Sequence, residues 1–207
     1  MTTEFFIIDS QGPPAWGMAE SAIVNAFNWH RNESTGLLHI CRTGPVGPPL
    51  MELSLTELVI TSAFKCWLEC EGLGRFEFKP VVKEQIVKMD WQLWDEESDR
   101  DVDVPGDVFN VEEYLATLPH SEEASESLGD LWEWTIPPGG ILDLDLPKTR
   151  SLHHRRIHLD SWNGDGIFRA VLNLGRIDGW PVATGDAKDR ILAAWPKYWR
   201  FVPCLVL

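Results

Sequence analysis

Two segments of the chain share the same order of hydrophobic and polar positions. Residues 59–82 align without a gap onto residues 182–205, at a constant offset of 123 positions. The identical pairs are Val59/Val182, Thr61/Thr184, Lys65/Lys188, Phe78/Phe201 and Pro80/Pro203. Because similarity at a fixed offset indicates a repeated structural unit, the sequence predicts two copies of one unit.

The first copy has the pattern of a strand, an amphipathic helix and a second strand. Thr61 or Ser62 is suited to cap the helix, and Gly72 or Gly74 is suited to end it. Helical spacing puts three apolar residues on one face: Phe64, Trp67 and Leu68. Apolar and charged residues then alternate from residue 76 to 82, which predicts a strand with one solvent-facing side.

The second copy repeats this order. Thr184 or Asp186 is suited to begin its helix, and Pro196 to end it. The apolar positions of the helix are Ala187, Ile191, Ala194 and Trp195. The final strand alternates with apolar residues at Trp199, Phe201, Pro203 and Leu205, the positions that match Phe76, Phe78, Pro80 and Val82 of the first copy.

The remaining pattern completes an α+β fold. Strands are predicted at 4–9, 37–41, 131–136, 141–146 and 152–159, and helices at 18–29 and from the capping box of Asn110 and Glu113 to Leu118. The segment 122–129 is polar and small, and is predicted to be mobile.

In this fold the two strand-helix-strand units, about 55–82 and 178–205, pack on a largely antiparallel sheet. Residues 1–89 form an N-terminal unit with the first repeat, 90–134 an acidic segment, and 135–207 a C-terminal unit with the second repeat, or all three form one continuous domain.

The negative charge lies in one part of the chain. The net charge is −14, and residues 90–133 hold fifteen acids against one base, Arg100. The rest of the chain balances seventeen acids with seventeen bases. Because an acidic block repels phosphate backbones, we expect no nucleic-acid binding and instead a positively charged protein partner.

Size and cysteine usage indicate a soluble cytoplasmic protein. With 207 residues and 44% hydrophobic content, the chain can bury a core without disulfides or metals. The four cysteines form no Cys-x-x-Cys pair, which argues against a disulfide framework or a zinc ribbon. Near the N-terminus only residues 5–8 form an apolar run, and no run reaches the roughly eighteen residues of a membrane span.

Candidate metal and catalytic residues give weak patterns. His153, His154 and His158 lie close in sequence, but Arg156 would share the face of His154 and His158 on a strand and repel a metal. We expect these side chains to meet acids of the block instead. Cys66 and Cys70, at i and i+4, fit buried small hydrophobic residues better than a metal site. No cofactor or metal is therefore predicted.

A hydrolase or modifying enzyme is one alternative. Asp143 and Asp145 would share a strand face and could act as acid and base, with His154, His158 and Asp160 nearby in sequence. The chain has no Gly-x-Ser-x-Gly elbow and no phosphate-binding glycine loop. A small-molecule binding module lined by some of the eleven tryptophans is the other alternative.

Aromatic residues beside acids favour a recognition surface, because rings bury large area at small entropy cost while carboxylates steer a basic partner. Trp91 and Trp94 are equally well explained as core residues. The predicted partner-binding residues are Trp91, Trp94, Asp95, Glu96, Glu97, Asp99, Asp101 and Asp103.

Two phrases carry a family resemblance. The segment LVITSAFKCWLECEGLGRFEFKPV, and residues 162–169 (WNGDGIFR) followed by a second helix and strand, resemble bacterial immunity proteins of polymorphic toxin systems related to the double-CXXCG group. Both CXXCG motifs are absent here, so no metal is carried over. The resemblance implies a non-enzymatic protein that binds and neutralises a cognate toxin domain.

Overall fold

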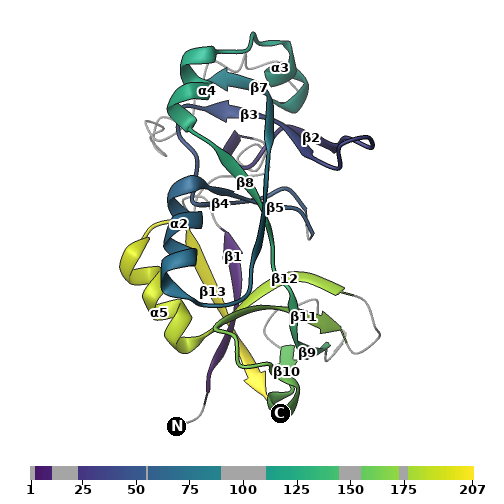
Figure 1. Cartoon of the computed structure of the whole chain (residues 1–207), viewed down its shortest axis with the longest axis vertical. Coiled ribbons are helices and arrows are strands. Elements are labelled where there is room, and N and C mark those ends of the chain that lie inside the picture. Colours follow the sequence, from purple (N-terminus) through teal and green to yellow (C-terminus); the bar gives the residue numbers. More distant parts are fainter. Residues whose placement is uncertain (1–2, 11–22, 55, 90–110, 145–154, 173–176) are drawn as a thin grey trace.

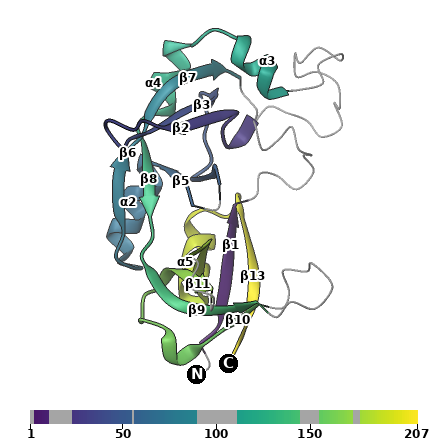
Figure 2. The ribbon, with the colours of Figure 1, turned by 90° about the vertical axis from the view of Figure 1, so that its right-hand side faces the viewer.

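The computed structural model describes residues 3–10, 23–54, 56–89, 111–144, 155–172 and 177–207. These residues form an α+β fold whose strands lie in three sheets, stacked along the long axis of the molecule (Figure 1). Both termini lie at the end of the molecule formed by the third sheet (Figures 1 and 2). Within the described ranges every helix is too short or too polar to cross a bilayer.

The first sheet has the order β2 (Asn28–Arg31), β3 (Leu38–Gly44), β7 (Val82–Lys88). Helices α3 (Val111–Thr117) and α4 (Glu122–Leu128) cover its two faces. Leu115 of α3 packs with Cys41, and Leu128 of α4 packs with Ile40. Because successive strand residues point to opposite faces, one helix lies on each side.

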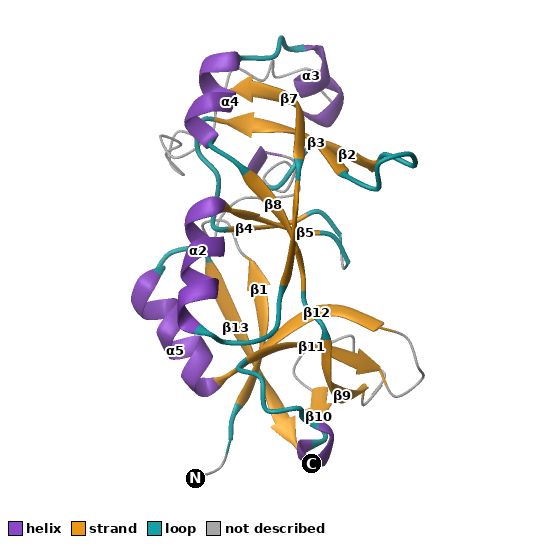
Figure 3. Ribbon diagram, in the orientation of Figure 1, coloured by secondary structure: helices purple, strands orange, loops and turns teal. Residues whose placement is uncertain are grey.

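The second sheet has the order β4 (Leu50–Glu52), β5 (Leu58–Thr61), β8 (Leu131–Thr135), β6 (Glu77–Pro80), with antiparallel neighbours throughout. Helix α2 (Ser62–Glu71) connects β5 to β6 and packs against this sheet (Figure 3). Strands β5 and β6 are therefore separated by β8, which comes from later in the chain.

The third sheet is a closed barrel of β1 (Phe5–Ser10), β12 (Ile177–Thr184), β11 (Ile167–Leu172), β9 (Pro138–Leu144), β10 (Arg155–Ile157) and β13 (Trp199–Val206). Helix α5 (Gly185–Ala194) connects β12 to β13, and a short 3-10 turn follows β10 at Leu159–Ser161. The pairs β10/β13 and β11/β9 are parallel and the others antiparallel.

The two predicted strand-helix-strand segments both have this order of elements, and each is split by an antiparallel strand. Strand β8 lies between β5 and β6, and β1 lies between β12 and β13. The registers also correspond. The matching pairs are Thr61–Leu131 and Thr184–Phe5, Ile60–Trp132 and Ala183–Phe6, Val59–Glu133 and Val182–Ile7, Phe78–Trp134 and Phe201–Ile8, Lys79–Glu133 and Val202–Ile7, and Pro80–Trp132 and Pro203–Phe6.

The helix signals in these segments are confirmed. Thr61 and Thr184 are the N-caps, with side-chain oxygens that accept from the backbone N–H three residues later. Such a cap satisfies one of the free N–H groups of the first turn. Gly72 ends α2 with a φ of 63°, a left-handed conformation that glycine adopts without steric cost.

One hydrophobic core joins the two segments. Phe64 and Leu68 of α2 and Ala187 and Ile191 of α5 belong to the same buried cluster, with aromatic residues from both segments around it. Figure 3 shows the two helices next to each other on one side of the molecule. Arg190 of α5 also forms an ion pair with Glu71 of α2. The segments thus lie in different sheets but share one interior.

Several expectations were wrong in detail. Residues 122–128 form helix α4, not a mobile segment, because Ser121 caps it and Glu122 and Glu123 favour its N-terminus. Asn28 and Trp29 lie in strand β2, outside any helix. Strand β9 begins at Pro138, before the predicted start at residue 141.

Other differences concern burial and pairing. Cys66 and Cys70 are exposed on α2, so they are not buried hydrophobic residues. The alternation from 76 to 82 does not belong to one strand, because Val82 begins β7 in the first sheet. The predicted segments 1–89, 90–134 and 135–207 also share sheets. Strand β1 pairs with β12 and β13, and β8 pairs with β5 and β6.

Candidate functional site

The predicted partner-binding residues lie outside the described residues. These are Trp91, Trp94, Asp95, Glu96, Glu97, Asp99, Asp101 and Asp103. The second half of the acidic block is described, and it forms helices α3 and α4 and strand β8. Only residues 111–133 of the acidic block can therefore be described in three dimensions.

Six exposed acids and no lysine or arginine occupy residues 111–130. We call this set the acidic helical surface, and it consists of Glu112, Glu113, Glu122, Glu123, Glu126 and Asp130. Each helix buries its apolar side, Leu115 in α3 and Ala124 with Leu128 in α4. The carboxylates consequently remain on the outside, and the side chain of Glu122 is 86% exposed.

Three nearby basic side chains already have partners. Lys88 forms an ion pair of 2.7 Å with Glu123, and this contact lowers the pKa of that carboxyl. The ammonium group of Lys83 donates to the backbone carbonyls of Ser125 and Gly129, at the end of α4. His120 lies 3.6 Å from Glu122. A cation at a helix C-terminus is favoured by the helix dipole. Lys83 therefore stabilises the end of α4 rather than neutralising the carboxylates of this helix.

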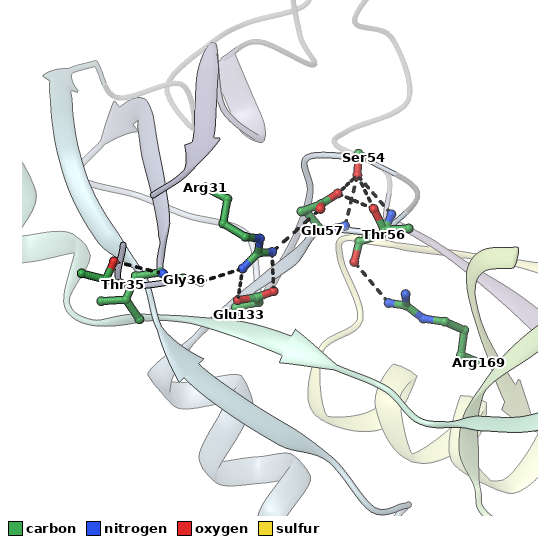
Figure 4. A network of polar contacts seen from close by, with 9 residues as sticks. Arg31, Thr35, Gly36, Ser54, Thr56, Glu57, Glu133 and Arg169 are labelled. Carbon is green, nitrogen blue, oxygen red and sulfur yellow. Dashed lines mark hydrogen bonds and ion pairs between the residues drawn. The ribbon is translucent and has the colours of Figure 1, made fainter. Parts of the chain in front are cut away.

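Glu133, the last acid of the block, is not part of that surface. It is buried, and its carboxylate makes a bidentate contact with the guanidinium of Arg31, at 2.8 and 3.1 Å (Figure 4). Fork-to-carboxylate pairs of this kind are strong and directional. This contact joins β2 of the first sheet to β8 of the second, so the role of Glu133 is structural.

The same network extends to the third sheet. Glu57 lies 3.8 Å from Arg31 and accepts hydrogen bonds from Ser54 and Thr56, while Arg169 of β11 donates to the carbonyl of Thr56 (Figure 4). Burial alone would raise the pKa of Glu57, but the two hydroxyls and the charges of Arg31 and Arg169 hold it below its ordinary value.

We predict a pH effect from Glu57. A carboxyl whose pKa is lowered by folding stabilises the protein above its unfolded pKa, and this contribution is lost as the pH falls through the folded pKa. Glu57→Gln should therefore reduce the loss of unfolding free energy between about pH 5 and about pH 3, measured by urea unfolding at both values. Glu77→Gln, an exposed residue on β6, is the control and should leave that difference unchanged. An unaltered pH dependence in Glu57→Gln would contradict the prediction.

Of the alternative catalytic residues, the structure brings two together. His158 Nε2 lies 2.6 Å from Asp143 Oδ2, with both side chains about one-third exposed. Asp145 and His154 lie outside the described residues. The expectation that His158 meets the acidic block was wrong, because Asp143 of β9 pairs alongside β10.

A histidine oriented by a carboxylate is half of a general-base arrangement, and it needs a nucleophile or substrate beside it. Ser161 is the closest hydroxyl in sequence, but it donates to the backbone carbonyl of His158. In the described part of the chain, no serine or cysteine side chain is hydrogen-bonded to the imidazole of His158. The pair is thus better suited to holding the turn after β10 than to catalysis.

The tryptophans of the described segments serve mainly as core. Trp134 is 1% exposed and Trp67, Trp132, Trp195 and Trp199 pack in the cluster shared by α2 and α5. Trp132 also donates to Ser62 at 2.9 Å. These side chains therefore do not line an open recognition surface.

An open cleft of about 560 Å³ lies where α2 ends and α5 begins. Its lining includes Glu4, Trp162, Thr184, Asp186, Asp189 and Arg190. The volume falls within the range of small-ligand sites. Arg190 is already bound to Glu71 and Asp186, so the cleft offers mainly carboxylates.

No family model matches this chain, and neither the curated proteins nor the solved structures show a significant match to it. Function therefore has to be argued from the residues themselves.

Proposed function

We propose that this protein is an inhibitory binding protein, of the immunity type that the sequence resembles, which holds a basic toxin domain through its acidic helical surface. The observation that supports the proposal is the group of six exposed carboxylates on residues 111–130, with no lysine or arginine among them. Four of them lie on or just after α4, and the other two lie on α3, on the opposite face of the first sheet. Lys83 is bound to backbone carbonyls at the end of α4, whereas Lys88 pairs with one of the six acids, Glu123.

The physical basis is charge complementarity. A surface of one sign steers an oppositely charged partner and accelerates association, and the effect weakens as salt increases. A toxin that acts on nucleic acid needs a positively charged cleft to hold phosphates. A rigid acidic surface would fill such a cleft and exclude the substrate.

The support beneath the acidic helices favours binding without large rearrangement. Helix α4 is anchored by its buried Leu128 and Ala124, by the cap at Ser121, and by Lys83 at its end. A backbone held by such contacts loses less entropy on binding than a mobile segment does. The acids are thus displayed on an ordered scaffold.

We test this with the product of the neighbouring gene, as the candidate toxin, in a binding titration at low and high salt. The variant Glu122→Lys/Glu126→Lys/Asp130→Lys should weaken binding at least about tenfold, mainly through slower association. The control Glu33→Lys/Glu77→Lys/Asp189→Lys changes the net charge equally at exposed positions on a loop, β6 and α5.

The control variant should bind nearly as tightly as the unmodified chain. Equal losses in both variants would indicate a general charge effect and remove the role of the acidic helical surface. The absence of any complex at low salt would end the proposal.

We also propose that the segments β5-α2-β6 and β12-α5-β13, with their inserted strands, are two copies of one unit. Besides the equivalent registers, Lys65 lies 4.7 Å from the ring of Trp132 and Lys188 lies 4.2 Å from the ring of Phe6. These are matching lysines over matching residues of the inserted strands. A cation over an aromatic ring contributes roughly 0.5–1 kcal/mol at exposed sites.

Lys65→Met and Lys188→Met should then lower the free energy of unfolding by similar amounts, about 0.5 kcal/mol each. Chemical denaturation of both variants measures this. A loss in one variant with none in the other would argue against equivalent roles.

A further inference from the structure

Three potential metal ligands meet on the first sheet, away from every site that the sequence singled out. His30 lies on β2, His39 on β3 and Glu84 on β7, and their ligand atoms all lie within 4.8 Å of one another. We infer that these three side chains form a binding site for a divalent transition metal ion, with Zn²⁺ as the best fit. This site does not depend on the proposed function.

Strand pairing brings the two histidines together. His30 and His39 are direct partners in the antiparallel register of β2 and β3. Directly opposite residues point to the same face of a sheet, with Cβ atoms about 5 Å apart. The two imidazole rings are accordingly close, with centroids 4.9 Å apart and planes inclined by 36°.

An irregularity in β7 adds the carboxylate. Ile40 pairs with Lys83, but the next residue, Cys41, pairs with Gln85, so Glu84 is the additional residue of a bulge. A bulge locally redirects side chains and is common beside binding sites. Glu84 Oε2 lies 3.5 Å from His30 Nδ1 and 4.0 Å from His39 Nδ1.

The ligand atoms, which lie within 4.8 Å of one another, must move closer together to suit tetrahedral zinc. Zinc–ligand bonds of about 2.0–2.2 Å at tetrahedral angles place ligand atoms roughly 3.3–3.5 Å apart. Two histidines and one glutamate are also a ligand set that zinc uses with a water in the fourth position. The site has room for that water, because the side chains of His30 and Glu84 are 52% and 48% exposed.

The cations adjacent in sequence are directed elsewhere. The guanidinium of Arg31 is bound to Glu133 in the second sheet, and the ammonium of Lys83 is bound to carbonyls at the end of α4. Neither charge opposes a metal at the three ligands. In this respect the site differs from His154 and His158, which Arg156 separates in sequence and at which no metal is predicted.

Such a metal would link three neighbouring strands. The residues come from segments separated by up to 54 positions in sequence, from His30 to Glu84. Because an ion that binds only the folded state stabilises it by mass action, zinc should raise the unfolding temperature of the protein.

The experiment uses the purified full chain, freed of metal with a chelator and titrated with Zn²⁺ against a chromophoric competitor. Co²⁺, titrated in parallel, reports tetrahedral coordination by its visible absorption. We expect one equivalent to bind and a rise in unfolding temperature with zinc. His39→Ala should weaken zinc binding at least about 100-fold, and Glu84→Gln at least about tenfold.

Two controls separate this site from other donors. His158→Ala removes a histidine paired with Asp143 in the barrel and should leave zinc binding unchanged. Cys66→Ser/Cys70→Ser removes the two exposed thiols of α2 and should do the same. Circular dichroism without metal checks that each variant is folded.

Binding that survives in His39→Ala, or that disappears in the cysteine variant, would overturn the assignment. A failure to bind one equivalent of Zn²⁺ or Co²⁺ would also overturn it. None of these outcomes bears on the toxin-binding proposal, because no partner is present in the experiment.

Discussion

Phe64→Ala is expected to lower the free energy of unfolding by about 4 kcal/mol, since removing a buried phenylalanine ring typically costs 3–5 kcal/mol. Phe64 is fully buried at the contact of α2 and α5. Its ring contacts two tryptophans from its own unit and two from the other, with centroid distances between 5.1 and 6.0 Å: Trp67, Trp134, Trp195 and Trp199. The loss should therefore affect both units.

Urea unfolding followed by far-ultraviolet circular dichroism measures this effect. Phe64→Leu is the matched control and should cost about 1–2 kcal/mol, because it keeps most of the buried apolar volume. If the ring joins the two units, the alanine variant should also show a single transition shifted to lower urea. A loss below about 1.5 kcal/mol, or unfolding of one unit alone, would contradict the shared core.

Arg42→Met is expected to raise the free energy of unfolding by about 3 kcal/mol. The guanidinium of Arg42 is completely buried, and burial lowers the pKa of Arg42 to about 9. At about 1.4 kcal/mol per pH unit, keeping the charge there costs on the order of 5 kcal/mol. Among the described residues, Nε and Nη1 of Arg42 have no hydrogen-bond partner.

Part of this cost is offset by two hydrogen bonds from Nη2, each of 3.1 Å, to the carbonyls of Val24 and Val46. Leaving those carbonyls without this donor costs about 1 kcal/mol each, which leaves the net gain stated above. Replacing a buried charge with an apolar residue of similar length is often stabilising. Methionine suits the narrow space beside Gly47 because it is unbranched.

The direction in which the free energy of unfolding changes with pH follows from proton binding. Between about pH 9 and the ordinary pKa of arginine, the unfolded state binds more protons than the folded state, so wild-type stability rises with pH there. Below pH 9 the penalty is fully present, and unfolding at pH 7.5 should show the gain of Arg42→Met. Arg42→Lys keeps the charge and should show no gain. If Arg42→Met lowered the free energy of unfolding, the prediction would be wrong, and the charge of Arg42 would be compensated in the folded protein.

Both proposed sites use the first sheet and its two helices. The acidic helical surface lies on α3, on α4 and at Asp130 just after α4, and the inferred metal ligands lie on the three strands that these helices cover. A metal that stiffens these strands would also stiffen the support of the helices. The two proposals can be tested separately, because zinc binding requires no partner and toxin binding can be measured in His39→Ala.

Local signals predicted the helices of the two units well. Thr61 and Thr184 cap them, Gly72 ends the first, and residues four apart, such as Phe64 and Leu68, share the buried face. These features depend on residues within one or two helical turns, so the sequence carries the information directly. The helix at 122–128 was missed because its small and polar residues resemble a loop, although Ser121 and Gly129 are present as cap signals.

The site residues were harder to predict. The acids of α3 and α4 were recognised as part of a charged block, but nothing in the pattern distinguished Glu133, which is buried against Arg31, from its exposed neighbours. His30 and His39 stand nine positions apart and do not form a spacing motif. They become neighbours only because the loop between β2 and β3 sets their register.

By itself the sequence determined the order of elements in the two units, their helix boundaries and the place of the negative charge. Only the tertiary structure decided that β8 and β1 insert into those units, that the units lie in separate sheets, and that Arg42 and Trp134 are buried. The reason is physical. A helix satisfies its backbone hydrogen bonds within itself, whereas a strand needs a partner that can come from anywhere in the chain, and its alternating pattern is the same whichever partner it takes.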